Sequence, residues 1–202
     1  EKGGYDHFVM KEINEQAHTI SEALRGRINL EDFTVNLGGI YDWVQTILDA
    51  HHIYITACGT SWHAALIGSY ILEELLNVPV KVEYASEFRY RETAVNGDSV
   101  VICVSQSGET ADTLAAIRKA REKGALTLGI MNVVGSSIAR ETHCGVYIHA
   151  GPEIGVASTK AFTAQVTIFN LIGILLAQKK GGDSAMIQSI INDLESLPGL
   201  VQ

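Results

Sequence analysis

The chain has 202 residues, of which 47% are hydrophobic and 19% are charged, so it can bury a sizeable core and is not a disordered or fibrous protein. Asp and Glu outnumber Lys and Arg by 23 to 15, and the net charge of −8 leaves no basic face for a nucleic acid. An anionic ligand would therefore have to be held by oriented N–H and hydroxyl groups instead of bulk positive charge.

Two helices are predicted ahead of the main fold. Apolar residues recur at helical spacing through residues 6–24, and Gly26 ends this segment. Its apolar face would consist of Phe8, Ile13, Ala17, Ile20 and Leu24. A second helix is predicted from about Leu37 to Ala50. We therefore interpret residues 1–50 as an N-terminal helical brace.

Strands and helices alternate through residues 51–180. Short apolar runs predict five strands, at 52–58, 80–84, 100–104, 125–131 and 146–149. The helices between and after them are predicted at 61–76, 109–123 and 157–178. Repeated strand–helix units form a parallel α/β sheet with helices on both faces, and ligands of such sheets lie beyond the carboxyl ends of the strands.

The most apolar stretch, Ala161 to Ala177, is 17 residues long and contains four polar side chains. It therefore predicts a buried core helix and not a membrane span. Residues 181–202 predict only a short helical segment that ends at Pro198-Gly199 and has the character of a linker toward a further domain.

The cysteines and histidines predict no metal site and no disulfide. The three cysteines, Cys58, Cys103 and Cys144, are far apart and lack a CxxC pair, which indicates reduced, buried thiols in a cytoplasmic protein. The seven histidines show no metal-ligand spacing. Neither GxxxxGK[ST] nor GxGxxG occurs, so we expect no nucleotide cofactor.

Two of the predicted strands end in turns that are rich in hydroxyl groups. Residues 58–61 read Cys-Gly-Thr-Ser and residues 105–110 read Ser-Gln-Ser-Gly-Glu-Thr, each directly before a predicted helix. Phosphate needs several aligned donors, and two such loops with two helix N-termini supply them without a lysine. The alternative interpretation is that Ser61, Ser107 and Thr110 are ordinary helix caps. Because two such loops follow strands of one sheet, we favour a phosphate site.

A third loop, residues 151–160, follows the last predicted strand and opens the last helix. Its two glycines could bring backbone groups to a ligand, but a plain loop with a Ser or Thr cap fits equally well. Glu153 and Lys160 are the local candidates for acid/base chemistry. A charged residue at a helix start is more often solvated, so we assign neither a catalytic role.

The segments ACGTSWHA at 57–64, SQSGET at 105–110 and EIGVASTKAFT at 153–163 resemble the first sugar-isomerase (SIS) domain of the glucosamine-6-phosphate synthases, the glutamine–fructose-6-phosphate aminotransferases. The leader at 7–13 is similar to the start of the isomerase half of those enzymes. One departure is Ala17, where similar proteins often have proline. The resemblance covers nearly the whole chain and implies a three-layer αβα sandwich of flavodoxin-like kind with a five-stranded parallel sheet.

The resemblance also implies a substrate site for fructose 6-phosphate or glucosamine 6-phosphate. The side chains around the phosphate would be Ser105, Gln106, Ser107 and Thr110. Thr60 and Ser61 would lie beside it on the sugar side, and the backbone of Val156 and the hydroxyl of Ser158 would touch the sugar.

In that family, ammonia comes from a glutaminase domain, and the catalytic lysine, glutamate and histidine belong to a second SIS domain and the C-terminal tail. We therefore expect this chain to bind sugar phosphate without converting it, to work with those two domains, and to form a homodimer, for which the apolar helix at 161–177 would offer a face. A stand-alone sugar-phosphate sensor, as attached to DNA-binding regulators, and a flavodoxin-like signalling domain are the alternatives. A regulator should carry a helix-turn-helix, which is not visible here, and a signalling domain should carry acidic residues at its strand ends.

Overall fold

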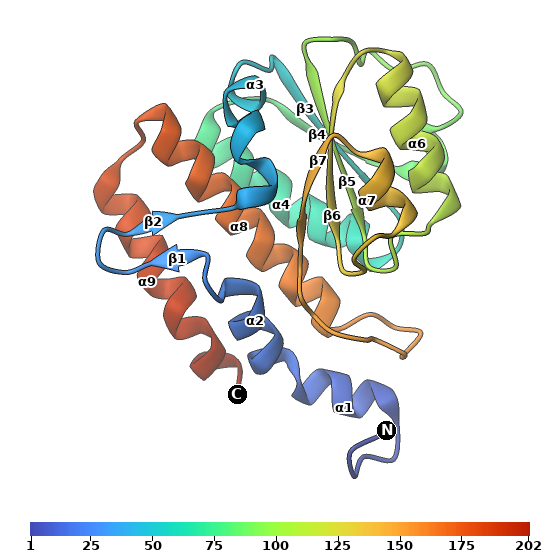
Figure 1. The fold of residues 1–202 in the computed structure, drawn as a ribbon. Helices are drawn as coiled ribbons and strands as arrows, with labels where there is room; N and C mark the ends of the chain where they lie inside the picture. Colours follow the sequence, from blue (N-terminus) through green and yellow to red (C-terminus); the bar gives the residue numbers. More distant parts are fainter.

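The computed structural model describes residues 1–202, and its centre is a five-stranded parallel sheet covered by helices on both faces (Figure 1). The strands are β3 (His52–Ala57), β4 (Val80–Tyr84), β5 (Ser99–Ser105), β6 (Leu126–Met131) and β7 (Cys144–Tyr147). They lie in the order β4-β3-β5-β6-β7, and every neighbouring pair is parallel. The predicted three-layer α/β fold is thus confirmed.

The middle strand, β5, has two buried faces. All seven of its residues are buried, as predicted for a central parallel strand. Val100 and Ile102 point into a large cluster with α4 (Thr60–Leu76) and α8 (Lys160–Lys180), whereas Val101 and Cys103 point into a smaller cluster with α6 (Ala111–Glu122) on the opposite face. Because side chains alternate between the two faces of a strand, β5 contributes to two separate hydrophobic cores.

Helix α8 is long and apolar enough to span a membrane, but 72% of its most apolar 18-residue window is buried inside the protein. The prediction of a core helix is therefore confirmed. Its Phe169 is fully buried against Gly68 of α4, where a Cβ atom would lie only 2.5 Å from the ring. Because the apolar side chains of α8 are covered within the chain, the helix offers no open face for a second copy, and our argument for self-association from this helix is wrong.

The single N-terminal helix that we predicted is divided in two at Glu15. The structure has α1 (Phe8–Asn14) and α2 (Gln16–Leu24), and the backbone N–H of Glu15 is shared between two carbonyl groups of the preceding turn. The predicted apolar face is correct in α2 but wrong in α1, where Ile13 is exposed and Glu12 is buried. The reason is that α1 packs on the loop at 151–156, whose backbone N–H groups donate to Glu12, and not on the core.

Short elements between the predicted ones escaped the sequence analysis. The second predicted helix is a 3-10 helix, η1 (Gly38–Trp43), followed by the short helix α3 (Val44–Leu48). The other elements are β1 (Ile28–Asn29), β2 (Thr34–Val35), α5 (Ala85–Phe88) and α7 (Ser137–Glu141). Elements of two to five residues are too short to show a hydrophobic period, so tertiary contacts define them.

The C-terminal segment is more than a short helical piece. Helix α9 (Ser184–Val201) has 18 residues, is capped by Asp183, and continues through Pro198. Ile187, Ile191 and Leu194 are buried where α9 packs against α2 and α8. The predicted end at Pro198 is therefore wrong. Helix α9 packs on this domain along most of the length of the helix. Its connection to a further domain stays a prediction.

An ion-pair network at the sheet edge leads to a pH-dependent expectation. Burial of Glu83 would raise its pKa, but hydrogen bonds and charge from Arg91 and Lys81 outweigh this effect and hold the pKa below its usual range. A depressed folded-state pKa adds stability at neutral pH, and this contribution is lost as the pH falls through that pKa. Glu83→Gln should therefore lower the free energy of unfolding at pH 7.

The difference in the free energy of unfolding between the wild type and Glu83→Gln should shrink as the pH falls below about 4, where the unperturbed carboxyl group is protonated. Urea unfolding at a series of pH values measures it. Glu74→Gln, at an exposed position of α4 with the same charge change, is the control. A gap between wild type and Glu83→Gln that does not depend on pH would contradict the expectation.

Candidate functional site

The candidate site lies where the direction of strand order changes. The crossover after β3 leads to the edge strand β4, whereas the chain then returns to the other side of β3 to form β5. In open parallel sheets this switch point is where ligands bind. The loops that follow β3 and β5 border a cavity of about 340 Å³. Its lining consists of Cys58, Gly59, Thr60, Ser61, Val104, Ser105, Gln106, Ser107, Thr110, Val156 and Ser158.

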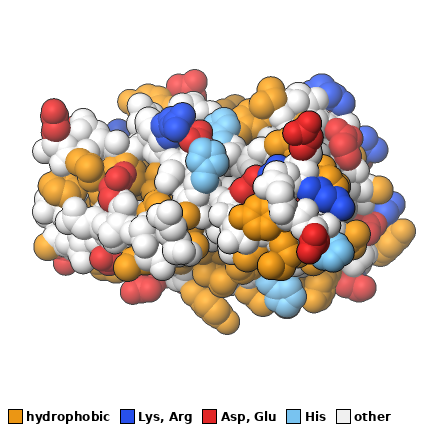
Figure 2. All heavy atoms as spheres, turned by 90° about the horizontal axis from the view of Figure 1, so that it is seen from below, with side chains coloured by type: hydrophobic (Ala, Val, Ile, Leu, Met, Phe, Trp, Pro, Cys, Tyr) orange, Lys and Arg blue, Asp and Glu red, His pale blue; other side chains and the backbone are white.

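All eight residues that the sequence analysis singled out for the substrate site line this one cavity. They come from three loops that are separated by up to about a hundred residues in the sequence. No lysine or arginine belongs to the lining. In the space-filling view, the Lys and Arg side chains are scattered among acidic and uncharged ones and do not form a single patch (Figure 2).

The loop after β5 is folded around the hydroxyl of Ser105, which is buried. Ser105 Oγ accepts the N–H of Gly108 at 3.0 Å and lies 3.1 Å from Thr110 Oγ1. Ser107 Oγ accepts the N–H of Glu109 at 3.2 Å. Thr110 occupies the N-cap position of α6 but makes no side-chain capping bond. Its hydroxyl is therefore turned toward the loop and the cavity, so the plain-cap alternative does not describe it.

Gly108 is required by the shape of this loop. Its φ angle is +70°, and a Cβ atom would lie 2.2 Å from Ser136 Oγ. A side chain would be strained by the backbone and would also collide with α7. The glycine thus allows the loop to pack closely on Ser136 at the start of α7.

The one carboxylate of this loop is directed away from the cavity. Glu109 Oε1 accepts the N–H of Ser137 at 2.7 Å, and hydrogen bonds from Ser137 lower the pKa of Glu109. The carboxylate is absent from the cavity lining. Its negative charge therefore does not oppose an anion there.

The loop after β3 presents the second hydroxyl group set. Gly59 precedes α4 with a φ angle of +58°, which a glycine adopts readily. Ser61 lies in the first turn of α4 and is buried, and its Oγ accepts the side-chain N–H of Gln165 at 2.9 Å. Because Gln165 supplies this hydrogen, the proton of Ser61 is free to point into the cavity. Ser61 is thus not a helix cap either.

Helices α4 and α6 both begin at the cavity. The first N–H groups of a helix have no partner within the helix and carry its positive dipole end. Two such ends and the hydroxyls of Thr60, Ser61, Ser105, Ser107 and Thr110 form a set of hydrogen-bond donors without a formal charge. This is the donor arrangement that suits a phosphate group.

The third loop closes one side of the cavity, with Val156 fully exposed at its rim. Ser158 Oγ donates to Glu153 Oε2 at 2.7 Å, and Glu153 Oε1 accepts the N–H of Thr159 at 2.8 Å. Lys160 is buried, and its Nζ lies 2.7 Å from Oε2 of Glu15. The expectation of a solvated charge is wrong for Lys160, which is buried, whereas Glu153 is half-buried. Both side chains hold the start of α8 in place.

The thiols are mostly remote from the cavity. Burial raises the pKa of Cys144 to about 12 and also raises the pKa of Cys103, so both are protonated and unreactive at neutral pH. Cys58 is only half-buried and belongs to the lining. No group of three or more His, Cys, Asp and Glu side chains comes together to hold a metal ion.

A larger cavity of about 820 Å³ adjoins the site and shares Gln106 with it. Its lining includes Arg25, Asn132 and His149 but none of the convergent Ser and Thr hydroxyls. Size alone would favour this cavity. The chemistry of donors favours the smaller one, because a phosphate needs several hydrogen bonds that converge on one point.

Comparison with known proteins agrees with this geometry. The family model described as "SIS domain" matches residues 46–175. The glutamine–fructose-6-phosphate aminotransferase (isomerizing) of Chlorobaculum tepidum is 54% identical over 201 residues, and isoform 2 of the human enzyme is 48% identical. Each alignment covers the whole of this chain but 33% and 30%, respectively, of the relative. The chain thus spans about a third of the length of these curated relatives.

A solved structure gives the same picture in three dimensions. The C-terminal domain of the glucosamine-fructose-6-phosphate aminotransferase from Francisella tularensis superposes with a TM-score of 0.91 and 36% sequence identity. The match covers 99% of this chain and 56% of that one. The matched family model, the strand order and the hydroxyl-lined cavity all agree. This chain therefore belongs to the SIS domain family.

Proposed function

We propose that this chain is the sugar-phosphate-binding domain of a glutamine–fructose-6-phosphate aminotransferase, and that it binds fructose 6-phosphate and glucosamine 6-phosphate. The observation that carries the proposal is the convergence of five hydroxyl groups and two helix N-termini on one cavity without a cation. The names of the most similar relatives support the same substrate.

The phosphate of the substrate fits the 105–110 loop at the start of α6. Ser105, Ser107 and Thr110 donate hydroxyl hydrogen bonds there, and Gln106 adds a side-chain amide. The sugar carbons then extend toward the other two loops, where the sugar-side residues are Thr60, Ser61, Val156 and Ser158. A cavity of about 340 Å³ lies at the small end of the range for ligand sites, which suits a hexose phosphate.

The residues of this chain bind and orient the sugar, and we assign the covalent steps to other domains. Proton transfer between C1 and C2 needs a positioned acid/base group, and imine formation needs a neutral amine. Glu153 and Lys160, the only local candidates from the sequence, are held by backbone N–H groups and by Glu15. We therefore propose a second SIS domain and a glutaminase domain as partners.

In this account, residues 51–180 form the binding domain, residues 1–50 brace it, and residues 181–202 lead toward the second SIS domain. The assembly is a cytoplasmic homodimer that needs no cofactor and binds no nucleic acid. The net charge of −8 is consistent with the last point.

Incubation of the purified chain with fructose 6-phosphate, with and without ammonium, tests the proposal. Calorimetry should detect binding, whereas assays for glucose 6-phosphate and glucosamine 6-phosphate should detect no product. Turnover that disappears in Glu153→Gln or Lys160→Ala would show that the chemistry is local and would contradict this division of labour. Absence of binding would contradict the substrate assignment itself.

A further inference from the structure

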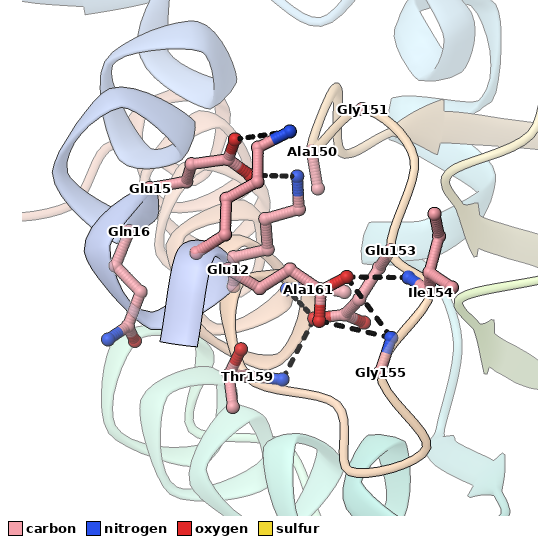
Figure 3. A network of polar contacts seen from close by, with 12 residues as sticks. Glu12, Glu15, Gln16, Ala150, Gly151, Glu153, Ile154, Gly155, Thr159 and Ala161 are labelled. Atoms are coloured by element: carbon pink, nitrogen blue, oxygen red, sulfur yellow. Dashed lines mark hydrogen bonds and ion pairs between the residues drawn. The ribbon is translucent and has the colours of Figure 1, made fainter. Parts of the chain in front are cut away.

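A buried carboxylate connects the N-terminal helix to the rim of the cavity. Glu12 of α1 is only 2% exposed, although most glutamates on a helix this close to a terminus are solvated. Its Oε1 accepts the N–H of Ile154 at 2.6 Å and the N–H of Gly155 at 3.1 Å (Figure 3). Glu12 thus holds two consecutive peptide groups of a loop that lies more than 140 residues later in the sequence.

The loop is packed tightly on α1 at this point. A Cβ atom on Gly155 would lie 2.5 Å from Glu12 Oε2 and 2.7 Å from Val9 Cγ2. The φ angle of Gly155 is not in the left-handed region, so the glycine is required here for space rather than for backbone conformation. Any larger residue would have to push the loop away from α1.

A second set of contacts fastens the other end of the loop. Glu15 pairs with the buried Lys160, and Gln16 Oε1 accepts the hydroxyl of Thr163 at 2.6 Å. Burial would raise the pKa of Glu15, but the hydrogen bond and charge of Lys160 outweigh this and lower it. Residues 12–16 therefore bind both the loop, at Ile154–Gly155, and the first turn of α8.

Between these two sets of contacts lie Val156 and Ser158, two of the four residues that line the sugar side of the cavity. Val156 directly follows Gly155, and Ser158 precedes the turn that Lys160 anchors. The phosphate loop at 105–110 makes no hydrogen bond or ion pair with α1 or α2. The contacts of Glu12 can therefore set the position of the sugar-side loop and leave the phosphate loop unchanged.

From this arrangement we propose that Glu12 is a positioning residue that holds the 153–158 loop against the sugar of the bound sugar phosphate. The inference rests on the proposed function, because it needs a sugar in the cavity. A purely structural role would make Glu12 matter for folding and not for ligand choice. A positioning role makes it matter for the sugar and not for the phosphate.

Glu12→Gln is the sharpest variant because it keeps the size of the side chain. In the wild type, Oε2 of Glu12 also accepts the N–H of Gly155, at 3.2 Å. In the variant an amide nitrogen, which cannot accept this N–H, replaces Oε2, and the hydrogen bonds to Oε1 lose the charge of the carboxylate. We expect the affinity for fructose 6-phosphate to fall about ten-fold, which corresponds to one lost charge-assisted hydrogen bond. The affinity for inorganic phosphate should stay the same.

The experiment titrates fructose 6-phosphate and inorganic phosphate separately and follows the backbone amide of Gly108 by NMR. Ser107→Ala should lower the affinity for both ligands. Glu74→Gln makes the same charge change as Glu12→Gln on an exposed surface and should change neither affinity. Gly155→Ala leaves Glu12 intact but forces the loop off α1, so it should show the same selective loss as Glu12→Gln. It keeps the test decisive if Glu12→Gln fails to fold.

Three outcomes would overturn the inference. Equal affinity of a folded Glu12→Gln or Gly155→Ala protein for fructose 6-phosphate would remove the positioning role and leave the proposed function intact. A parallel loss of both ligands would show a general effect on the domain. A wild type that binds neither ligand would overturn the proposed function, and the inference with it.

Discussion

Replacement of Phe169 by alanine is expected to lower the free energy of unfolding by about 3–5 kcal/mol. The ring is fully buried in α8 and fills the space that Gly68 of α4 leaves open. Removal of the ring exposes a void between the two helices that pack most extensively against each other, and the glycine has no side chain that could fill it.

Urea or thermal unfolding measures this effect, with Tyr70→Ala as the control. Tyr70 is an aromatic residue of α4 that is 68% exposed, so its truncation should change the free energy of unfolding by no more than about 0.5 kcal/mol. If Phe169→Ala cost as little as Tyr70→Ala, the close approach of α4 and α8 would be wrong.

The double substitution Ser107→Ala, Thr110→Ala is expected to weaken fructose 6-phosphate binding at least about 100-fold. Each hydrogen bond to a charged phosphate contributes about 1.5–3 kcal/mol, and two are lost. Both side chains line the cavity and neither caps a helix, so the fold should tolerate their loss.

Calorimetric titration of fructose 6-phosphate measures the loss. The matched control is Ser184→Ala, Ser196→Ala, which removes two hydroxyls from exposed positions of α9. Wild-type affinity in the Ser107→Ala, Thr110→Ala protein would mean that the phosphate is bound elsewhere.

The sheet and the loops of the site were predictable because both follow from local sequence. The apolar run at 100–104 could only be a buried strand, and the Ser- and Thr-rich turns stand where strands change to helices. The carboxyl ends of neighbouring parallel strands meet at one edge, so two such turns had to lie close together. Six of the eight site residues come from these two turns and line one cavity, in agreement with that argument, whereas Val156 and Ser158 were expected only from the resemblance.

The contacts that shape the site from outside were not predictable in this way. Glu12 and Gln165 act across more than a hundred residues, on Gly155 and Ser61, and no spacing in the sequence connects them. The only available signal was a polar residue, Gln165, within the apolar α8. We used Gln165 only as one of four polar residues that favour a core helix, and Glu12 only as a member of the leader at 7–13.

Helix α9 was underestimated although its signals were present. Asp183 is a standard N-cap, and Ile187, Ile191 and Leu194 recur at helical spacing. We took Pro198 as the end of the helix because proline removes a helix hydrogen bond and its ring crowds the preceding turn. Helix α9 nevertheless continues to Val201.

The most direct test of the central claim is an NMR titration of the isotope-labelled chain with fructose 6-phosphate, with every backbone amide followed. The phosphate-site account predicts saturable shifts that are largest at residues 59–61 and 105–110, with a smaller set at Val156 and Ser158. Shifts that are largest around Arg25 and His149 in the neighbouring cavity, or no saturable shift at all, would contradict it.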